Sequence, residues 1–71
     1  MIIEVENEEQ YEAAKYWLER FERSLRYYET EATHLSPRLL KAHRDARRST
    51  IAELRARMAE YEARQRGKAT A

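Results

Sequence analysis

The sequence contains no cysteine, and only one glycine and one proline among its 71 residues. The absence of cysteine excludes disulfide bonds, thiolate metal ligands and a thiol nucleophile. A single glycine, Gly67, excludes a glycine-rich phosphate-binding loop, and so few turn-forming residues are not typical of a β-sheet protein. The first residues lack the basic and apolar regions of a signal peptide, and nothing points to an oxidising compartment. We therefore expect a cytoplasmic protein.

Long hydrophobic runs are also missing, and no uncharged stretch approaches the roughly 20 residues that a membrane span needs. We expect no membrane partner. Instead, 42% of the residues are hydrophobic and 38% are charged, with a net charge of only +1. Because the hydrophobic residues recur at helical spacing, this composition favours a folded all-α protein over a disordered chain. The length permits one domain, residues 1–71, with 1–6 as an N-terminal flank and 67–71 as a frayed tail.

A first long helix is predicted over residues 8–33. Asn7 is a good N-cap with Gln10 three residues later, and Glu8 and Glu9 place negative charge at the helix N-terminus, where the helix dipole favours it. No glycine or proline interrupts the segment that follows. Apolar residues recur there every three or four positions, and they predict a buried stripe of Tyr11, Ala14, Leu18, Phe21, Leu25, Tyr28 and Ala32.

A break at Ser36-Pro37 precedes a second helix, predicted over residues 37–66. Pro37 suits the first helical position, Ser36 suits the N-cap, and Gly67 is expected to end the helix in a left-handed conformation. The buried stripe of this helix is predicted to contain Leu40, Ile51, Leu54, Met58 and Tyr61. Between Leu40 and Ile51 the stripe holds His43, Arg44 and Arg47 instead of apolar residues. We expect the His43 imidazole to reach Asp45, a glutamate or water.

Two helices of similar length joined by a short link predict an antiparallel hairpin. Counting back from the turn places Leu40 near Tyr28, Arg47 near Phe21, Ile51 near Leu18 and Met58 near Tyr11. Charge supports this pairing, because residues 1–35 hold nine acidic and four basic side chains, whereas residues 36–71 hold four acidic and ten basic ones. An acidic helix therefore lies beside a basic one.

A hairpin has one buried face, and a chain of this length gains only about 3–5 kcal/mol from a single core, so association is expected to add stability. Tyr16 and Tyr27 lie away from the predicted stripe, and Trp17 flanks it, where the hairpin itself could cover the ring. Aromatic residues of this kind are enriched at interfaces. We predict a homodimeric four-helix bundle in which Tyr16, Trp17 and Tyr27 form the contact surface. The alternative is that exposed tyrosines need no partner and that the chain is a structural protein without a dedicated ligand.

Candidate catalytic and metal-binding residues are few, and we expect neither enzymatic activity nor a cofactor. Two helices enclose no cavity for a nucleophile and its base. Glu31 and His34 have the Glu-x-x-His spacing of di-iron four-helix proteins, but the opposing segment 38–41 supplies no carboxylate. We therefore expect no metal site.

A basic run in the second helix raises nucleic-acid binding as an alternative function, since phosphate contacts scale with such charge. The run consists of Arg38, Lys41, Arg44, Arg47, Arg48 and Arg55. The acidic first helix lies alongside, so the interpretation that we favour is internal pairing. Arg44 and Arg47 would then pair with Glu22, Glu29 or Asp45, or stack on Phe21 and Tyr28.

The segment Ile3-Glu4-Val5-Glu6-Asn7-Glu8-Glu9-Gln10-Tyr11-Glu12-Ala13-Ala14 opens the chain, and Ala52-Glu53-Leu54 and Glu60-Tyr61-Glu62 lie towards its end. These segments resemble the N-terminal helical hairpin of host-inhibition-of-growth type antitoxins. The resemblance implies a hairpin used for protein contact, with a toxin as a possible partner. It covers the hairpin and not the DNA-reading domain of that family, so it does not imply operator binding, and no individual functional residue carries over. The positions of Ile2, Ile3 and Val5 stay open.

Overall fold

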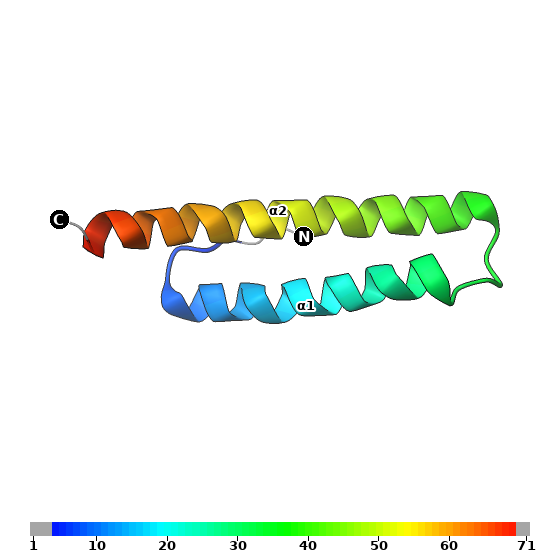
Figure 1. Ribbon diagram of the computed structural model, residues 1–71, viewed down its shortest axis with the longest axis horizontal. Coiled ribbons are helices and arrows are strands. Elements are labelled where there is room, and N and C mark those ends of the chain that lie inside the picture. The colour runs from blue at the N-terminus through cyan, green and yellow to red at the C-terminus, as the bar shows by residue number, and fades with distance from the viewer. Residues whose placement is uncertain (1–3, 70–71) are drawn as a thin grey trace.

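The computed structural model describes residues 4–69, which form two helices, α1 (Glu8–Thr30) and α2 (Pro37–Ala69). The helices lie side by side and antiparallel, so the predicted all-α hairpin is confirmed (Figure 1). The molecule is a rod of 53 × 18 × 16 Å with a radius of gyration of 15.2 Å, whereas a compact chain of this length has about 11 Å. Within the described residues, neither helix has a segment apolar enough to cross a membrane.

The start of α1 follows the predicted capping pattern. The Asn7 side chain accepts a hydrogen bond from the Gln10 backbone N–H at 2.8 Å. The Gln10 side-chain oxygen in turn accepts one from the Glu6 backbone N–H, also at 2.8 Å. Two backbone donors at the helix entrance are thereby satisfied, which fixes the direction in which the preceding residues leave the helix.

The end of α1 differs from the prediction, because the helix stops at Thr30 rather than at residue 33. The backbone N–H groups of Glu31 and Ala32 both donate to the Tyr27 carbonyl, at 2.8 and 3.1 Å, and this shared acceptor closes the helix. Ala32 is then buried in the connection, at 2% exposure. The connection therefore spans residues 31–36, and it ends at Ser36, whose hydroxyl accepts from the Leu39 N–H at 3.3 Å as the predicted N-cap.

The predicted role of Gly67 is wrong. No glycine in the described part of the chain has a positive φ, and α2 continues through Gly67 to Ala69. The residues expected to form a frayed tail are thus helical as far as 69, and residues 70–71 lie outside the described range. A Cβ placed on Gly67 would meet nothing within 4 Å, so no packing against the rest of the chain forces the helix to stop there.

The register of the hairpin is shifted by about one helical turn from the predicted one. Tyr28 stacks on His43 rather than lying against Leu40, and Tyr11 stacks on Tyr61 rather than meeting Met58. The cause is the longer connection, because it allows α2 to begin beyond the end of α1 (Figure 1). The first turn of α2 therefore overhangs α1.

The core is a single row of side chains between the helices. Five predicted stripe residues are buried: Ala14, Ala32, Ile51, Leu54 and Tyr61. The other predicted core residues are only half-buried: Tyr11, Leu18, Phe21, Leu25, Tyr28, Leu40 and Met58. Because the described part of the chain has no third helix over this row, its side chains stay close to water on both broad faces of the hairpin.

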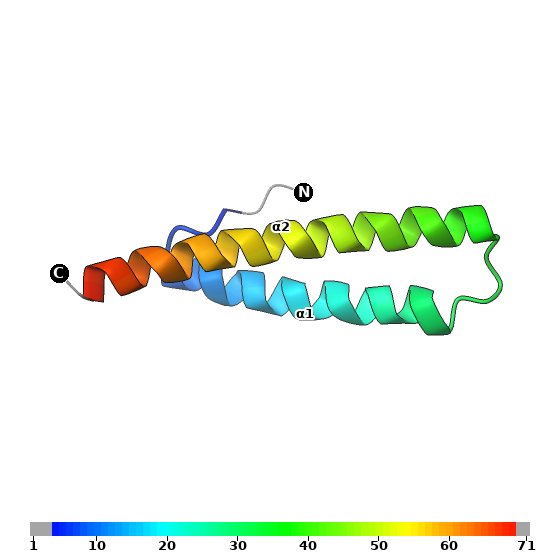
Figure 2. The same ribbon diagram turned by 45° about the horizontal axis from the view of Figure 1, so that its top comes forward.

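Val5 extends the core from outside the helices. The chain before α1 crosses to the C-terminal half of α2 (Figure 2), where Val5 packs with Ala14, Leu54 and Tyr61 and is 4% exposed. The Arg64 guanidinium fixes this crossing by donating to the Val5 carbonyl at 2.7 Å. The flank thus covers one end of the hairpin, a role that the sequence left open.

Leu54 is the largest fully buried side chain, and it tests the position of the core. We expect Leu54→Ala to lower the free energy of unfolding by about 2–5 kcal/mol, because the lost packing leaves a cavity. Leu39→Ala is the matched control, since Leu39 is 51% exposed and its loss is expected to change stability by less than about 0.5 kcal/mol. Urea unfolding followed by circular dichroism measures both, and equal effects would contradict the assigned core.

Candidate protein-interaction surface

The hairpin has two broad faces, and on one of them ion pairs connect the two helices. Glu22 of α1 pairs with Arg55 of α2 at 3.2 Å, and Glu29 pairs with Arg48 at 3.1 Å. We call this side the ion-pair face. Between the pairs lies an open groove of about 410 Å³, to which Leu25, Ile51 and Ala52 also contribute. The four charged groups are between 39% and 62% exposed, so each pair stabilises the fold only modestly, by about 0–1 kcal/mol.

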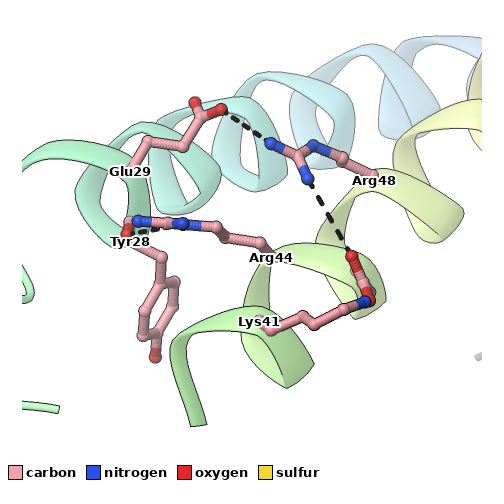
Figure 3. Close-up of polar contacts among 6 residues, drawn as sticks. Tyr28, Glu29, Lys41, Arg44 and Arg48 are labelled. Atoms are coloured by element: carbon pink, nitrogen blue, oxygen red, sulfur yellow. Dashed lines mark hydrogen bonds and ion pairs between the residues drawn. The ribbon is translucent and has the colours of Figure 1, made fainter. Parts of the chain in front are cut away.

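Most of the basic run in α2 has a partner inside the hairpin. Arg44 Nε donates to the Tyr28 carbonyl at 3.1 Å, and Figure 3 shows its side chain beside that of Arg48, which reaches Glu29. Lys41 pairs with Asp45 at 2.6 Å, and this hydrogen bond lowers the pKa of the Asp45 carboxyl. Arg38 is exposed. The predicted internal pairing is therefore present: Arg47 stacks on Tyr28, one of the expected partners, whereas Arg44 contacts a backbone carbonyl.

Arg44 and Arg47 do not reach the predicted carboxylates Glu22 and Glu29, which pair with Arg55 and Arg48 instead. Arg47 lies in the seam between the helices, where its guanidinium sits 5.1 Å from the centre of the Tyr28 ring. Its Nε also donates to Ser24 Oγ at 3.3 Å. These are cation–π and hydrogen-bonding contacts to groups other than carboxylates, so both half-buried arginines line the seam between the helices.

The opposite side of the hairpin, which we call the aromatic face, carries no ion pair between the helices in the part of the chain described. Ring contacts and helical spacing place on it Trp17, Phe21, Tyr28, His43, Ala46 and Thr50. Trp17 and Phe21 are one turn apart on α1, with ring centres 6.2 Å apart. Tyr28 joins the two helices because its ring lies flat on His43, at 4.5 Å and an interplanar angle of 5°. Tyr28 is not among the partners expected for His43, and the Asp45 carboxylate pairs with Lys41 and Arg48 instead.

The structure separates the three predicted contact residues. Trp17 lies beside Phe21 on the aromatic face and is 40% exposed, so the hairpin does not cover it fully. Tyr16 and Tyr27 are 55% and 42% exposed and turn towards the side of α1 that points away from α2. Arg20 holds Tyr16 through a hydrogen bond of 3.1 Å to its hydroxyl. Leu39, at 51% exposure, is a further exposed apolar residue that the sequence reading did not single out.

Two tyrosines are paired with carboxylates where the start of α1 meets α2. Tyr11 donates to Glu62 at 3.0 Å and Tyr61 donates to Glu8 at 3.1 Å, while the two rings stack at 5.0 Å. The hydrogen bond to Glu62 raises the pKa of Tyr11, and burial followed by the hydrogen bond to Glu8 raises the pKa of Tyr61. Both phenols are therefore held in the neutral form, and each donates across the helix interface.

The side chains that commonly bind metal ions are dispersed in the part of the chain that the structure describes. No three histidine, aspartate or glutamate side chains there gather closely enough to hold a metal ion. Glu31 and His34 are exposed in the connection between the helices. Comparison of the chain with protein-family models, with curated proteins and with solved structures finds no match. The resemblance to antitoxins therefore stays a prediction, and function must be argued from the surface of the hairpin.

The tyrosine–carboxylate pairs predict a loss of stability in alkali. Because the pKa values of Tyr11 and Tyr61 are raised above 10.0 on folding, the folded chain holds these protons more tightly than the unfolded chain does. Their contribution to stability is complete below pH 10 and declines as the pH rises beyond it. Urea unfolding between about pH 8 and pH 11 should show this decline. A variant with both Tyr11→Phe and Tyr61→Phe should show a smaller decline in stability with pH, because it lacks the two ionisable phenols. A decline identical to that of the original chain would contradict the assignment of this effect to Tyr11 and Tyr61.

Proposed function

We propose that this chain acts by protein contact, without a catalytic step, and that it pairs with a second copy of itself into a four-helix bundle. The observation that supports the proposal best is the amount of exposed surface. The chain exposes 5493 Å², whereas a compact protein of 8.6 kDa exposes about 4,700 Å². The difference of about 800 Å² is similar to the area that one partner buries in a protein–protein interface of standard size.

The half-open core supports the same proposal. Only six hydrophobic residues among those described are buried, and two of them, Val5 and Ala32, lie outside the helices. Side chains as large as Phe21 and Tyr28 remain half-buried between α1 and α2. A second layer of helices would take this apolar area out of water, which is the dominant favourable term in association.

A second copy is a better candidate partner than a nucleic acid or a toxin. Nucleic-acid binding requires free cations, yet Arg44, Arg48 and Arg55 already have partners within the hairpin. The antitoxin resemblance supports contact with a protein but does not specify which surface makes it. Self-association also suits the net charge of +1, because two copies repel one another little.

The proposal predicts a dimer in solution. Sedimentation equilibrium from micromolar to millimolar concentration should give a mass twice the monomer value of 8.6 kDa. The midpoint of thermal unfolding should rise with protein concentration, because mass action stabilises a folded dimer. A mass of 8.6 kDa over the whole range, with a midpoint independent of concentration, would exclude self-association as the function.

A further inference from the structure

The two faces of the hairpin differ in what they offer a second copy. On the ion-pair face, the pairs Glu22–Arg55 and Glu29–Arg48 cross between the helices, and covering them would remove four charged groups from water. Desolvation of that kind offsets most of the attraction within each pair. On the aromatic face, Arg20 contacts the Trp17 ring and Arg47 contacts the Tyr28 ring, but no ion pair joins the two helices there among the described residues, so covering its rings buries apolar surface without covering such a pair.

The geometry points to the aromatic face as the surface on which the second copy packs, with α1 of each copy lying over α2 of the other. This inference rests on the proposed function and adds the surface and the arrangement. Three observations carry it: the surplus exposed area, the shapes of the two helices on this face, and their opposite charges.

The side chains on this face favour packing of α1 of one copy on α2 of the other copy. On the aromatic face α1 contributes the large rings of Trp17, Phe21 and Tyr28, spaced at four and seven residues, so they form one ridge. The same face of α2 carries the smaller Ala46 and Thr50, four residues apart. A ridge of rings packs more closely over a strip of small side chains than over a second ridge of rings. Two copies related by twofold symmetry would form this contact twice.

Charge favours the same arrangement. Residues 1–35 have nine acidic and four basic side chains, whereas residues 36–71 have four acidic and ten basic ones. Within the helices themselves, α1 has six acidic and four basic side chains and α2 has four acidic and ten basic ones, so α1 over α2 brings together helices of opposite net charge, whereas α2 over α2 would bring together two strongly basic helices. A twofold axis parallel to the helices produces this arrangement and makes every neighbouring pair of helices antiparallel, as in an up-down-up-down bundle.

The register of the hairpin places particular residues at this interface. Within one copy, Ser24 lies level with Arg47 and Tyr28 with Arg44. A twofold axis parallel to the helices keeps each residue at its own height. Phe21 of one copy then lies level with Thr50 of the second copy, and Ala46 of the second copy lies between Ser24 and Tyr28. Trp17, which is 40% exposed in the single hairpin, becomes covered.

The test uses Trp17 as a probe, because it is the only tryptophan in the chain. Acrylamide quenching of its fluorescence should weaken as the concentration rises through the dimerisation range measured by sedimentation. Ala46→Glu places a carboxylate at the centre of the aromatic face, on a residue that is exposed in the single hairpin. We expect it to weaken association by about tenfold or more while circular dichroism shows the same helix content.

Ala52→Glu is the matched control, because the same substitution falls on an exposed residue of the same helix that lines the groove on the ion-pair face. It should dimerise like the original chain. A dimer whose Trp17 quenching is independent of concentration, or one disrupted by Ala52→Glu but not by Ala46→Glu, would overturn this inference and leave the proposed dimer standing. A monomer throughout would overturn both.

Discussion

Two helices lying side by side share one line of contact, which buries little apolar surface. The main features of this protein compensate for that limit. Among residues 4–69, no third helix covers the row formed by Ala14, Leu54 and the residues around them. The chain before α1 therefore folds back over α2 and adds Val5 at one end, where Arg64 holds its carbonyl. At the other end the connection buries Ala32. Both additions lengthen the row without widening it.

The same constraint explains why arginines occupy the seam. Between Leu40 and Ile51 the inner side of α2 carries Arg44 and Arg47, whose long apolar stems fill space while their charged ends reach the Tyr28 carbonyl and ring. A single row of contact leaves the edges of the seam close to water, so these charges are never fully desolvated. Arginine can therefore take a place that a deeper core would reserve for leucine. One consequence is that basic charge which looks available in the sequence is already engaged in the fold.

The difference between the two faces bears on function. Ion pairs between α1 and α2 close one face and orient the acidic helix along the basic one. On the other face the rings of Trp17, Phe21 and Tyr28 are incompletely covered, and single cations, Arg20 and Arg47, contact two of them. The two broad faces therefore differ, because ion pairs cross one and exposed rings lie on the other. This asymmetry is why we propose contact with a second copy rather than chemistry carried out by the hairpin alone.

The sequence by itself determined the features that depend on residues close to one another in the chain. The Asn7 and Ser36 caps act within three residues, and helical spacing placed Ala14, Ile51, Leu54 and Tyr61 on the inner stripes, so the two helices and their buried sides could be predicted. Only the tertiary structure decided the register, the burial of Val5, the partners of Arg44 and Arg47, and the extension of α2 past Gly67. Of these, the register and the partners that follow from it depend on how far a six-residue connection lets one helix slide along the other. Registers that differ by one helical turn bury similar stripes. The choice between them therefore comes from contacts such as Tyr28 on His43, which join residues distant in the sequence.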